Sequence, residues 1–200
     1  MRAIIDQSRS ADAPYLVAKV FSDKPDAAGI EAARQLGVEA QALIPKTADR
    51  AAYDRELSEA IGGCSPSLIV LAGFMRILSP QFTTQFAGRI LNIHPSLLPK
   101  YPGLHTHRRA LEARDAEHGA TVHFVTEQLD GGPGVLRARV AVMAEDDEAS
   151  LAARVQAQEH RIYPLAVRWY CEGRLRYGEG QAWLDGRLLR EPVQFTGAEN

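Results

Sequence analysis

The residues best suited to chemistry in this sequence are Asn92 and His94, which end an apolar segment and precede a stretch containing three prolines. Because side chains alternate along a strand, two residues in these positions share one face. An amide and an imidazole aimed together can donate hydrogen bonds to a developing oxyanion, and the imidazole can also transfer a proton. A turn asparagine beside a histidine with satisfied hydrogen bonds is the competing interpretation, and these residues alone leave both open.

A second candidate is the turn DGGPG at 130–134. Its glycines allow a sharp turn that can project Asp130 into a cleft. A carboxylate close to His94 favours the protonated imidazole, which keeps that ring ready to act as an acid near neutral pH. A plain Asp-Gly turn is the alternative. The glycines do not form a phosphate cradle by spacing, because neither the G-x-G-x-x-G nor the P-loop pattern occurs in this chain.

The number of histidines raises the question of a metal site, and the candidates are His94, His105, His107, His118 and His123. No cysteine or acidic residue stands at a recognisable ligand spacing from them, and the HExxH pattern is absent. Cys64 and Cys171 likewise form neither a metal-ligand spacing nor a disulfide framework. We therefore expect no metal and interpret the remaining histidines as solvated or loop residues.

Three further groups fit a binding site by position but also fit an ordinary structural role. Gln156 and Glu159 lie three apart on a predicted helix and share a face, which either anchors an amine substrate or is simply solvated. The segment Met75-Arg76-Ile77-Leu78 lies at the carboxyl end of an apolar strand, where it either lines a ligand site or only connects strand and helix. Arg50, taken alone, is interpreted as a surface residue.

Strand-like and helix-like segments alternate along the chain, which predicts βαβ units and a mostly parallel sheet. The predicted strands are 15–21, 38–44, 67–72, 89–93, 120–125 and 135–142. The predicted helices are 2–7, 25–35, 49–61, 108–114 and 148–171, with another starting at Ser79-Pro80. Residues 1–190 are expected to form a single domain, and residues 191–200 a flexible tail. Ligand sites in such sheets lie at the carboxyl ends of strands, which is where Asn92 and His94 are predicted to be.

Composition excludes several classes of protein. The chain has 200 residues, 46% of them hydrophobic, and a net charge of −2, so it resembles one globular domain and not a sequence-independent nucleic-acid binder. Its first residues include one base and no long apolar region, so no signal peptide is expected. The longest apolar run is far shorter than the roughly 20 residues that a membrane span needs. We therefore expect a cytoplasmic protein with neither nucleic acid nor membrane as a partner.

Three segments carry a resemblance to a known family: AGFMRIL at 72–78, NIHPSLLPKYPGLHTH at 92–107 and LDGGP at 129–133. They closely resemble the phosphoribosylglycinamide formyltransferases, the folate-dependent enzymes of de novo purine synthesis, and the resemblance runs from Met1 to about Leu188. The run KYPGLHTH is similar to these enzymes rather than to formyltetrahydrofolate hydrolases or methionyl-tRNA formyltransferases. The resemblance implies an α/β, Rossmann-like formyltransferase fold with a mostly parallel, twisted sheet flanked by helices.

The resemblance also implies roles for individual residues. Asn92, His94 and Asp130 match the catalytic trio. The folate-contacting positions are matched by Arg50, Met75, Arg76, Ile77, Leu78, Asn92 and Val125, and the substrate-side positions by Gln156 and Glu159. The implied co-substrate is 10-formyltetrahydrofolate and the implied acceptor is glycinamide ribonucleotide. Transfer is implied to be direct, without a metal, in a monomer or a homodimer.

Two features depart from the family pattern. Gly134 stands where an apolar residue is expected. The chain also begins in a helix-like segment, just after the position of the family's central first strand and its Gly-x-Gly-Ser-Asn turn, whose backbone amides bind the substrate phosphate. The resemblance thus implies that the first strand is missing. We expect the native start to lie upstream of Met1, and a chain that starts at Met1 to bind the ribonucleotide poorly and to have little activity.

Two other functions stay open. One is a formyltetrahydrofolate hydrolase-like enzyme, which would release formate without needing the ribonucleotide. The other is an inactive, truncated folate-binding module, which would bind folate without transferring the formyl group. A metal-dependent hydrolase is a more remote interpretation and would require stoichiometric metal.

Overall fold

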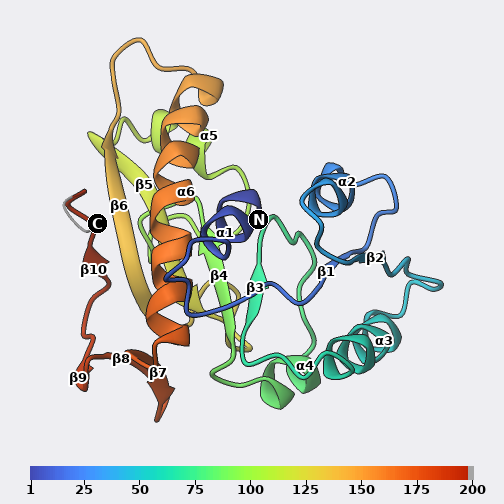
Figure 1. Cartoon of the computed structure of the whole chain (residues 1–200). Helices are drawn as coiled ribbons and strands as arrows, with labels where there is room; N and C mark the ends of the chain where they lie inside the picture. The colour runs from blue at the N-terminus through green and yellow to red at the C-terminus, as the bar shows by residue number, and fades with distance from the viewer. Residues whose placement is uncertain (198–200) are drawn as a thin grey trace.

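A mixed five-stranded sheet forms the centre of the larger part of the molecule (Figure 1). The computed structural model describes residues 1–197. The strand order is β10-β6-β5-β4-β3, and the strands are β3 (Ile69–Leu71), β4 (Ile90–His94), β5 (Glu117–Phe124), β6 (Gly134–Ala141) and β10 (Val193–Gln194). The pairs β3/β4 and β6/β10 are parallel, whereas β5 runs antiparallel to both of its neighbours.

Strand β5 is where the sheet departs from the expected alternation of parallel strands and helices. Only residues 125–133 connect β5 to β6. A connection this short makes two neighbouring strands antiparallel, because a parallel pair needs a crossover of a dozen residues or more. The rest of the prediction is confirmed, because β3, β4, β6 and β10 all point the same way.

Helix α6 (Glu148–Cys171) covers one face of this sheet (Figure 1). It starts at a capping box in which Asp147 accepts a hydrogen bond from the Ser150 backbone N–H at 2.7 Å, and the Ser150 hydroxyl accepts one from the Asp147 N–H at 3.1 Å. The helix continues through the buried Pro164. Its apolar face packs with β5 and β6 in the main core, and α1 (Arg2–Gln7) lies against it.

A second core lies around the helices between β2 and β4. It includes buried side chains from α3 (Arg50–Gly62) and α4 (Pro80–Gln85), among them Leu57, Ile61 and Phe82. The predicted helix start at Ser79-Pro80 is confirmed, because the Ser79 hydroxyl accepts a hydrogen bond from the Phe82 N–H at 3.4 Å and Pro80 is the first helical residue. This core fixes the segment that connects β3 to α4.

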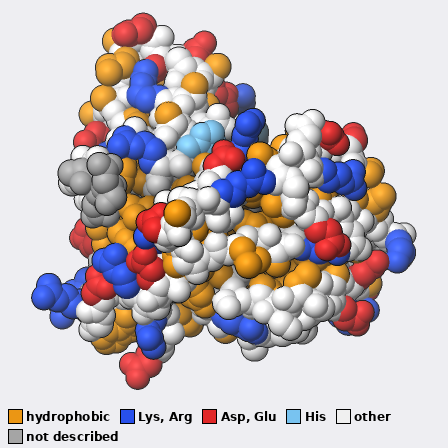
Figure 2. Space-filling model, in the orientation of Figure 1, with side chains coloured by type: hydrophobic (Ala, Val, Ile, Leu, Met, Phe, Trp, Pro, Cys, Tyr) orange, Lys and Arg blue, Asp and Glu red, His pale blue; other side chains and the backbone are white. Residues whose placement is uncertain are grey.

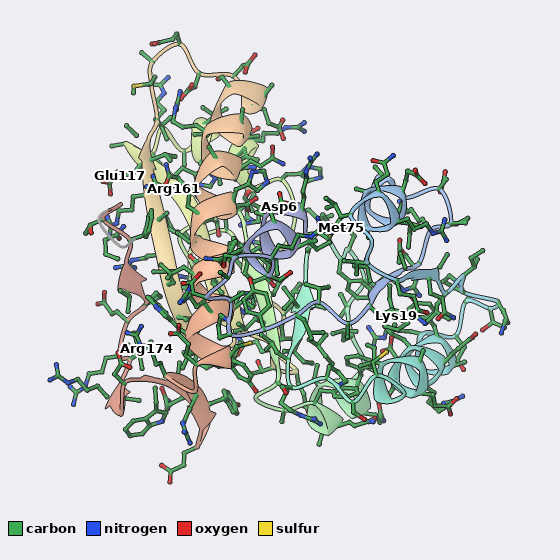
Figure 3. The ribbon with its side chains drawn as sticks, viewed as in Figure 1. Asp6, Lys19, Met75, Glu117, Arg161 and Arg174 are labelled. Carbon is green, nitrogen blue, oxygen red and sulfur yellow. The ribbon has the colours of Figure 1, made fainter. Side chains whose placement is uncertain are left out.

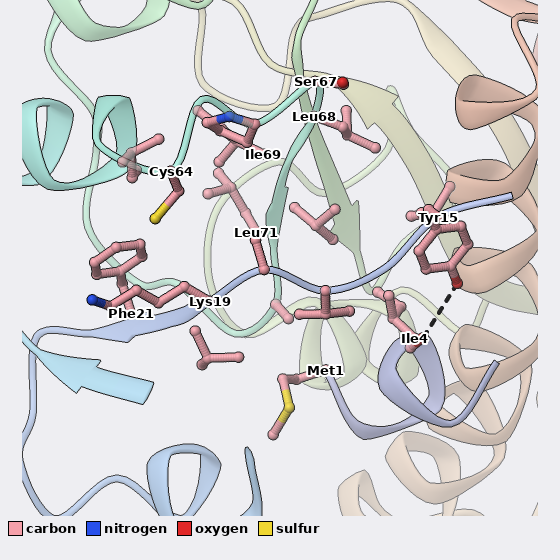
Figure 4. Close-up of a pocket in the computed structure, with 18 of the residues that line it drawn as sticks. Met1, Ile4, Tyr15, Lys19, Phe21, Cys64, Ser67, Leu68, Ile69 and Leu71 are labelled. Carbon is pink, nitrogen blue, oxygen red and sulfur yellow. Dashed lines mark hydrogen bonds between the residues drawn. The ribbon is translucent and has the colours of Figure 1, made fainter. Parts of the chain in front are cut away.

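Strands β1 (Val20–Ser22) and β2 (Ala40–Ala42) form a separate parallel pair, packed with α2 (Ala28–Gln35). Within the described residues no strand lies between β1 and β3. An apolar cavity of about 620 Å³ lies between them, lined by segments 14–23 and 64–74 together with residues of α1 (Figure 4). The Tyr15 hydroxyl donates to the Ile4 carbonyl at 3.2 Å and ties the first of these segments to α1.

The C-terminal region continues the fold beyond its expected boundary. Strands β7 (Leu175–Gly178), β8 (Gln181–Leu184) and β9 (Arg187–Leu188) form a small antiparallel sheet. The expected domain ended at residue 190, with a flexible tail from 191, whereas β10 pairs with β6 and the Phe195 N–H donates to the Arg137 carbonyl at 2.8 Å. The remainder of the expected tail, residues 198–200, lies outside the described residues.

Candidate active site

Asn92 and His94 lie at the carboxyl end of β4, as predicted. Nε2 of His94 lies 2.8 Å from the carbonyl oxygen of Tyr101, and Nδ1 lies 3.4 Å from Oδ2 of Asp130. Because a carbonyl oxygen only accepts, Nε2 carries a hydrogen in this arrangement. An imidazolium therefore has an acceptor for each of its N–H groups. Such a ring is placed to hold a proton and to pass it on.

Asp130 reaches His94 from the loop between β5 and β6. Its backbone is left-handed, with φ of 50°, and its side chain is only 7% exposed. The Gly103 N–H donates to Oδ2 of Asp130 at 2.8 Å, so the proline-rich segment also fixes the carboxylate. A side chain at Gly132 would overlap the carbonyl oxygen of Phe124, so this turn requires glycine there. The turn thus projects Asp130 toward His94.

His123 joins these residues, although its position in the sequence did not predict a place in this site. Its Nε2 lies 3.2 Å from Nδ2 of Asn92 and 3.8 Å from Oδ1 of Asp130. Burial lowers the pKa of His123 below that of a free histidine. No signal in the sequence links residues 92 and 123, because the pairing register of β4 with β5 brings them together.

The segment after β4 is held in place by polar contacts with Asp115 and, beyond them, by a pair of histidines. The Tyr101 hydroxyl donates to Asp115 at 2.8 Å, and the Lys100 ammonium lies 2.7 Å from the same carboxylate. The hydrogen bond from Lys100 holds the pKa of Asp115 below its usual range. Below this segment, Nδ1 of His107 lies 3.1 Å from Nε2 of His118, and burial lowers the pKa of His118 to about 4. These contacts position the Tyr101 carbonyl that His94 uses.

A shallow pocket of about 460 Å³ contains both predicted substrate-side residues, Gln156 and Glu159 of α6, together with Met75. Ile93, next to His94 in the chain, lines the same pocket. Figure 2 shows the surface hollowed between the lobe that holds the start of α6 and the lobe that holds α2, and Figure 3 places Met75 on the side of α1 that faces α2. Burial raises the pKa of Glu159, although the positive Met1 amino group acts in the opposite direction. A half-buried carboxylate here suits an ammonium or amine group.

The predicted folate-lining residues after β3 are not equivalent. Met75 and Ile77 are 80% and 51% exposed, so their side chains are available to a ligand. Leu78 is buried in the second core, and Val125 packs against the same core. The structure therefore places Leu78 in the scaffold beneath this surface rather than on it.

The two arginines predicted to contact folate also differ. The Arg76 guanidinium lies over the Tyr53 ring, 4.5 Å from its centroid, and 3.8 Å from Asp23. Its buried Nε has no hydrogen-bond partner in the structure, which leaves one donor unused. Arg50 is exposed at the first position of α3. A folate contact of either residue stays a prediction.

Within residues 1–197, no group of three or more His, Cys, Asp and Glu side chains is placed to hold a metal ion. His107 and His118, two of the histidines considered for such a site, contact each other instead. In the same part of the chain, no helix is long and apolar enough to cross a membrane.

Comparison with known proteins identifies the family. The model of a family described as formyl transferase matches residues 1–167. The chain belongs to the formyl transferase family. Within this family it is 57% identical over 200 residues to the phosphoribosylglycinamide formyltransferase of Escherichia coli (strain K12), which covers all of this chain and 93% of that protein. The enzyme of the same name from Haemophilus influenzae is 48% identical and covers 94% of this chain and 90% of its own length.

Solved structures of formyl transferases agree with the fold. The phosphoribosylglycinamide formyltransferase of Coxiella burnetii superposes with a TM-score of 0.90 and 41% identity, over 96% of this chain and 92% of that one. A formyltetrahydrofolate deformylase from Pseudomonas syringae has a TM-score of 0.81 and 24% identity, over 91% of this chain and 60% of that one. The second likeness shows a shared fold only. The predicted Rossmann-like formyltransferase fold is confirmed.

Proposed function

We propose that this formyl transferase moves the formyl group of 10-formyltetrahydrofolate to the amine of N1-(5-phosphoribosyl)glycinamide. The observation that carries the proposal is the convergence of Asn92, His94 and Asp130 at the end of β4, beside a pocket that holds a half-buried carboxylate. The high identity to phosphoribosylglycinamide formyltransferases over the whole chain supports this acceptor.

In the proposed reaction, the amine of the ribonucleotide attacks the formyl carbon and a tetrahedral oxyanion forms. The Asn92 amide and an N–H of His94 stabilise this oxyanion by hydrogen bonds. The new carbon–nitrogen bond forms and the bond to the folate nitrogen breaks, so the amine loses one proton and the folate nitrogen gains one. The Asp130 carboxylate stays beside His94 as a hydrogen-bond acceptor while the proton moves from the amine to the folate nitrogen. Where these groups do not touch, water carries the proton between them.

The residues around the site support a position for each substrate. Glu159 and Gln156 line the pocket on the side formed by α6. The carboxylate there suits the amine end of the ribonucleotide. The exposed side chains of Met75 and Ile77 offer an apolar surface to the folate ring system. The Nε2 hydrogen of His94 points to the Tyr101 carbonyl oxygen at 2.8 Å, and we expect the formyl oxygen to take over this hydrogen when the folate binds.

Formyltetrahydrofolate hydrolysis is the second candidate function. Its support is the fold shared with a formyltetrahydrofolate deformylase, at 24% identity. The phosphoribosylglycinamide enzymes match this chain with much higher identity, and we therefore favour transfer to the amine.

The test is to incubate the purified chain with both substrates and to follow formylated ribonucleotide and free formate by mass spectrometry. The ribonucleotide is varied over a wide range of concentration, so that weak binding is separated from absent chemistry. Formylated product that depends on the ribonucleotide, and that forms on the order of 100-fold or more slowly in Asn92→Ala, supports the proposal. Formate released at the same rate without ribonucleotide indicates the hydrolase. Folate binding without either product refutes both enzymatic functions.

A further inference from the structure

His123 is a buried histidine that the reaction scheme above does not use, although it contacts the site. It lies one residue before the end of β5, and its side chain is 2% exposed. Its Nδ1 lies 3.0 Å from its neighbour's carbonyl oxygen, that of Phe124, and its Nε2 lies 3.2 Å from the amide nitrogen of Asn92. Each ring nitrogen therefore has one polar neighbour at hydrogen-bond distance, and Oδ1 of Asp130 lies farther from Nε2, at 3.8 Å.

The Phe124 carbonyl decides which nitrogen of His123 carries the hydrogen. A carbonyl oxygen can only accept, so Nδ1 must be the donor in this contact. In a neutral ring, Nε2 is then unprotonated and can only accept. The group that faces Nε2 must be a donor, which fixes the Asn92 side chain with its NH₂ toward His123 and not its oxygen.

The orientation of the Asn92 amide is what the proposed chemistry needs. One of its two amide hydrogens is used by His123, and the second stays available to an oxygen in the site. If the amide were turned over, its carbonyl oxygen would face His123 and the direction of hydrogen bonding between the two side chains would be reversed. The neutral ring is supported by burial, which lowers the pKa of His123, against the opposing attraction of Asp130 at 3.8 Å.

We infer that His123 is a positioning residue, which acts through its single tautomer to hold the Asn92 amide as a donor toward the formyl oxygen. The inference rests on the proposed function, because it assigns to Asn92 the role of oxyanion donor. His123 itself touches neither the reacting carbon nor the amine in this scheme. The Phe124 carbonyl of β5 sets the tautomer of His123, and this tautomer sets the orientation of the Asn92 amide on β4.

The structural half of the inference is tested on the wild-type chain without any activity measurement. Nitrogen-15 NMR of histidine-labelled protein reports the protonation of each ring nitrogen, and His123→Gln identifies the signals. We expect a protonated Nδ1 and an unprotonated Nε2 at neutral pH. A protonated Nε2, in either the other tautomer or the imidazolium, overturns the inference.

The functional half is tested by a double-mutant cycle between positions 92 and 123. Asn92→Ala is expected to lower kcat by a factor on the order of 100 to 1,000, the usual effect of losing an oxyanion donor. His123→Phe is expected to lower kcat roughly 10-fold or more, with KM values within about 3-fold of wild type, because the amide persists but is no longer oriented. His123→Gln, which keeps an acceptor for the Asn92 amide, should retain more activity than His123→Phe.

The decisive quantity is the effect of His123→Phe in the Asn92→Ala background. If His123 acts only through Asn92, the double variant has the kcat of Asn92→Ala within about 3-fold. Equal effects in both backgrounds overturn the inference and indicate an independent structural role. His118→Phe removes another buried histidine of β5 and serves as the matched control, with an effect expected to be the same in both backgrounds.

The two proposals fail in different ways. If wild-type protein forms no formylated ribonucleotide, the proposed function fails. The NMR experiment still tests the tautomer of His123 independently of this result. If wild type is active and the cycle is additive, only the role of His123 fails. Should His123→Phe not fold, His123→Gln takes its place in the cycle, and its effect is again expected to vanish in the Asn92→Ala background.

Discussion

Acid stability should depend on His118, which is 1% exposed in β5 and contacts His107 at 3.1 Å. Burial lowers the pKa of His118 from 6.5 to about 4 in the folded protein. The unfolded chain therefore binds a proton between these pH values and the folded chain does not. Stability consequently rises with pH across this window, and it is lost as the pH falls below about 6.5.

The size of the effect follows from the same two pKa values. Each pH unit in the window is equivalent to about 1.4 kcal/mol for one group. At pH 5 the protein is roughly 1.5 units below the pKa of the unfolded histidine. Lowering the pH from 7 to 5 should therefore reduce the free energy of unfolding by about 2 kcal/mol through His118 alone. Burial also lowers the pKa values of His107 and His123, and their contributions add to the total loss in the wild-type chain.

The assay is urea unfolding at pH 7 and pH 5 for wild type and for His118→Gln. Glutamine cannot be protonated here and still offers His107 a neutral polar partner. We expect the variant to lose about 2 kcal/mol less than wild type between the two pH values. His160→Gln, which changes an exposed histidine of α6, is the control and should keep the wild-type pH dependence. If His118→Gln and wild type lose the same stability, the reasoning about the buried pair is refuted.

Three further changes test other parts of the structure. Asp130→Asn removes the charge beside His94, the histidine proposed to be catalytic, and should lower kcat on the order of 100-fold with little change in KM. A raised KM at unchanged kcat would assign Asp130 to binding alone. Gly119→Ala places a methyl group against a carbonyl of β6 and should destabilise the fold by roughly 2 kcal/mol or more in urea unfolding, while Gly62→Ala, with open space around it, should change stability by less than about 1 kcal/mol. Tyr163→Phe removes the hydroxyl whose single hydrogen is shared between carbonyls of β3 and β4, at 2.7 and 2.9 Å, and should cost about 1 to 3 kcal/mol. Tyr177→Phe in the C-terminal hairpin is its control, and an equal loss in both tyrosine variants would contradict this role for Tyr163.

Predictions based on local signals agree closely with the structure. Helix α6 occupies residues 148–171 as predicted, and the Ser79-Pro80 helix start is confirmed, because caps and helical periodicity act over a few residues. The carboxyl end of β4 was also placed correctly by its apolar run. By contrast, the strand predicted at 15–21 is reduced to Val20–Ser22. A strand needs hydrogen-bonding neighbours, and among residues 1–197 the only strand that pairs with β1 is β2.

The sequence by itself determined the chemical types in the site, the elements that carry them and, through three motifs, the family. Asn92 and His94 share one strand end, and Asp130 sits in a glycine-rich turn, so spacing and turn chemistry are enough to select them. Only the tertiary structure decided that His123 faces Asn92, that the Tyr101 carbonyl engages His94, and that β10 completes the sheet after residue 190. These contacts join residues through strand register and loop closure. Such geometry depends on how whole elements pack, and no short stretch of sequence encodes it.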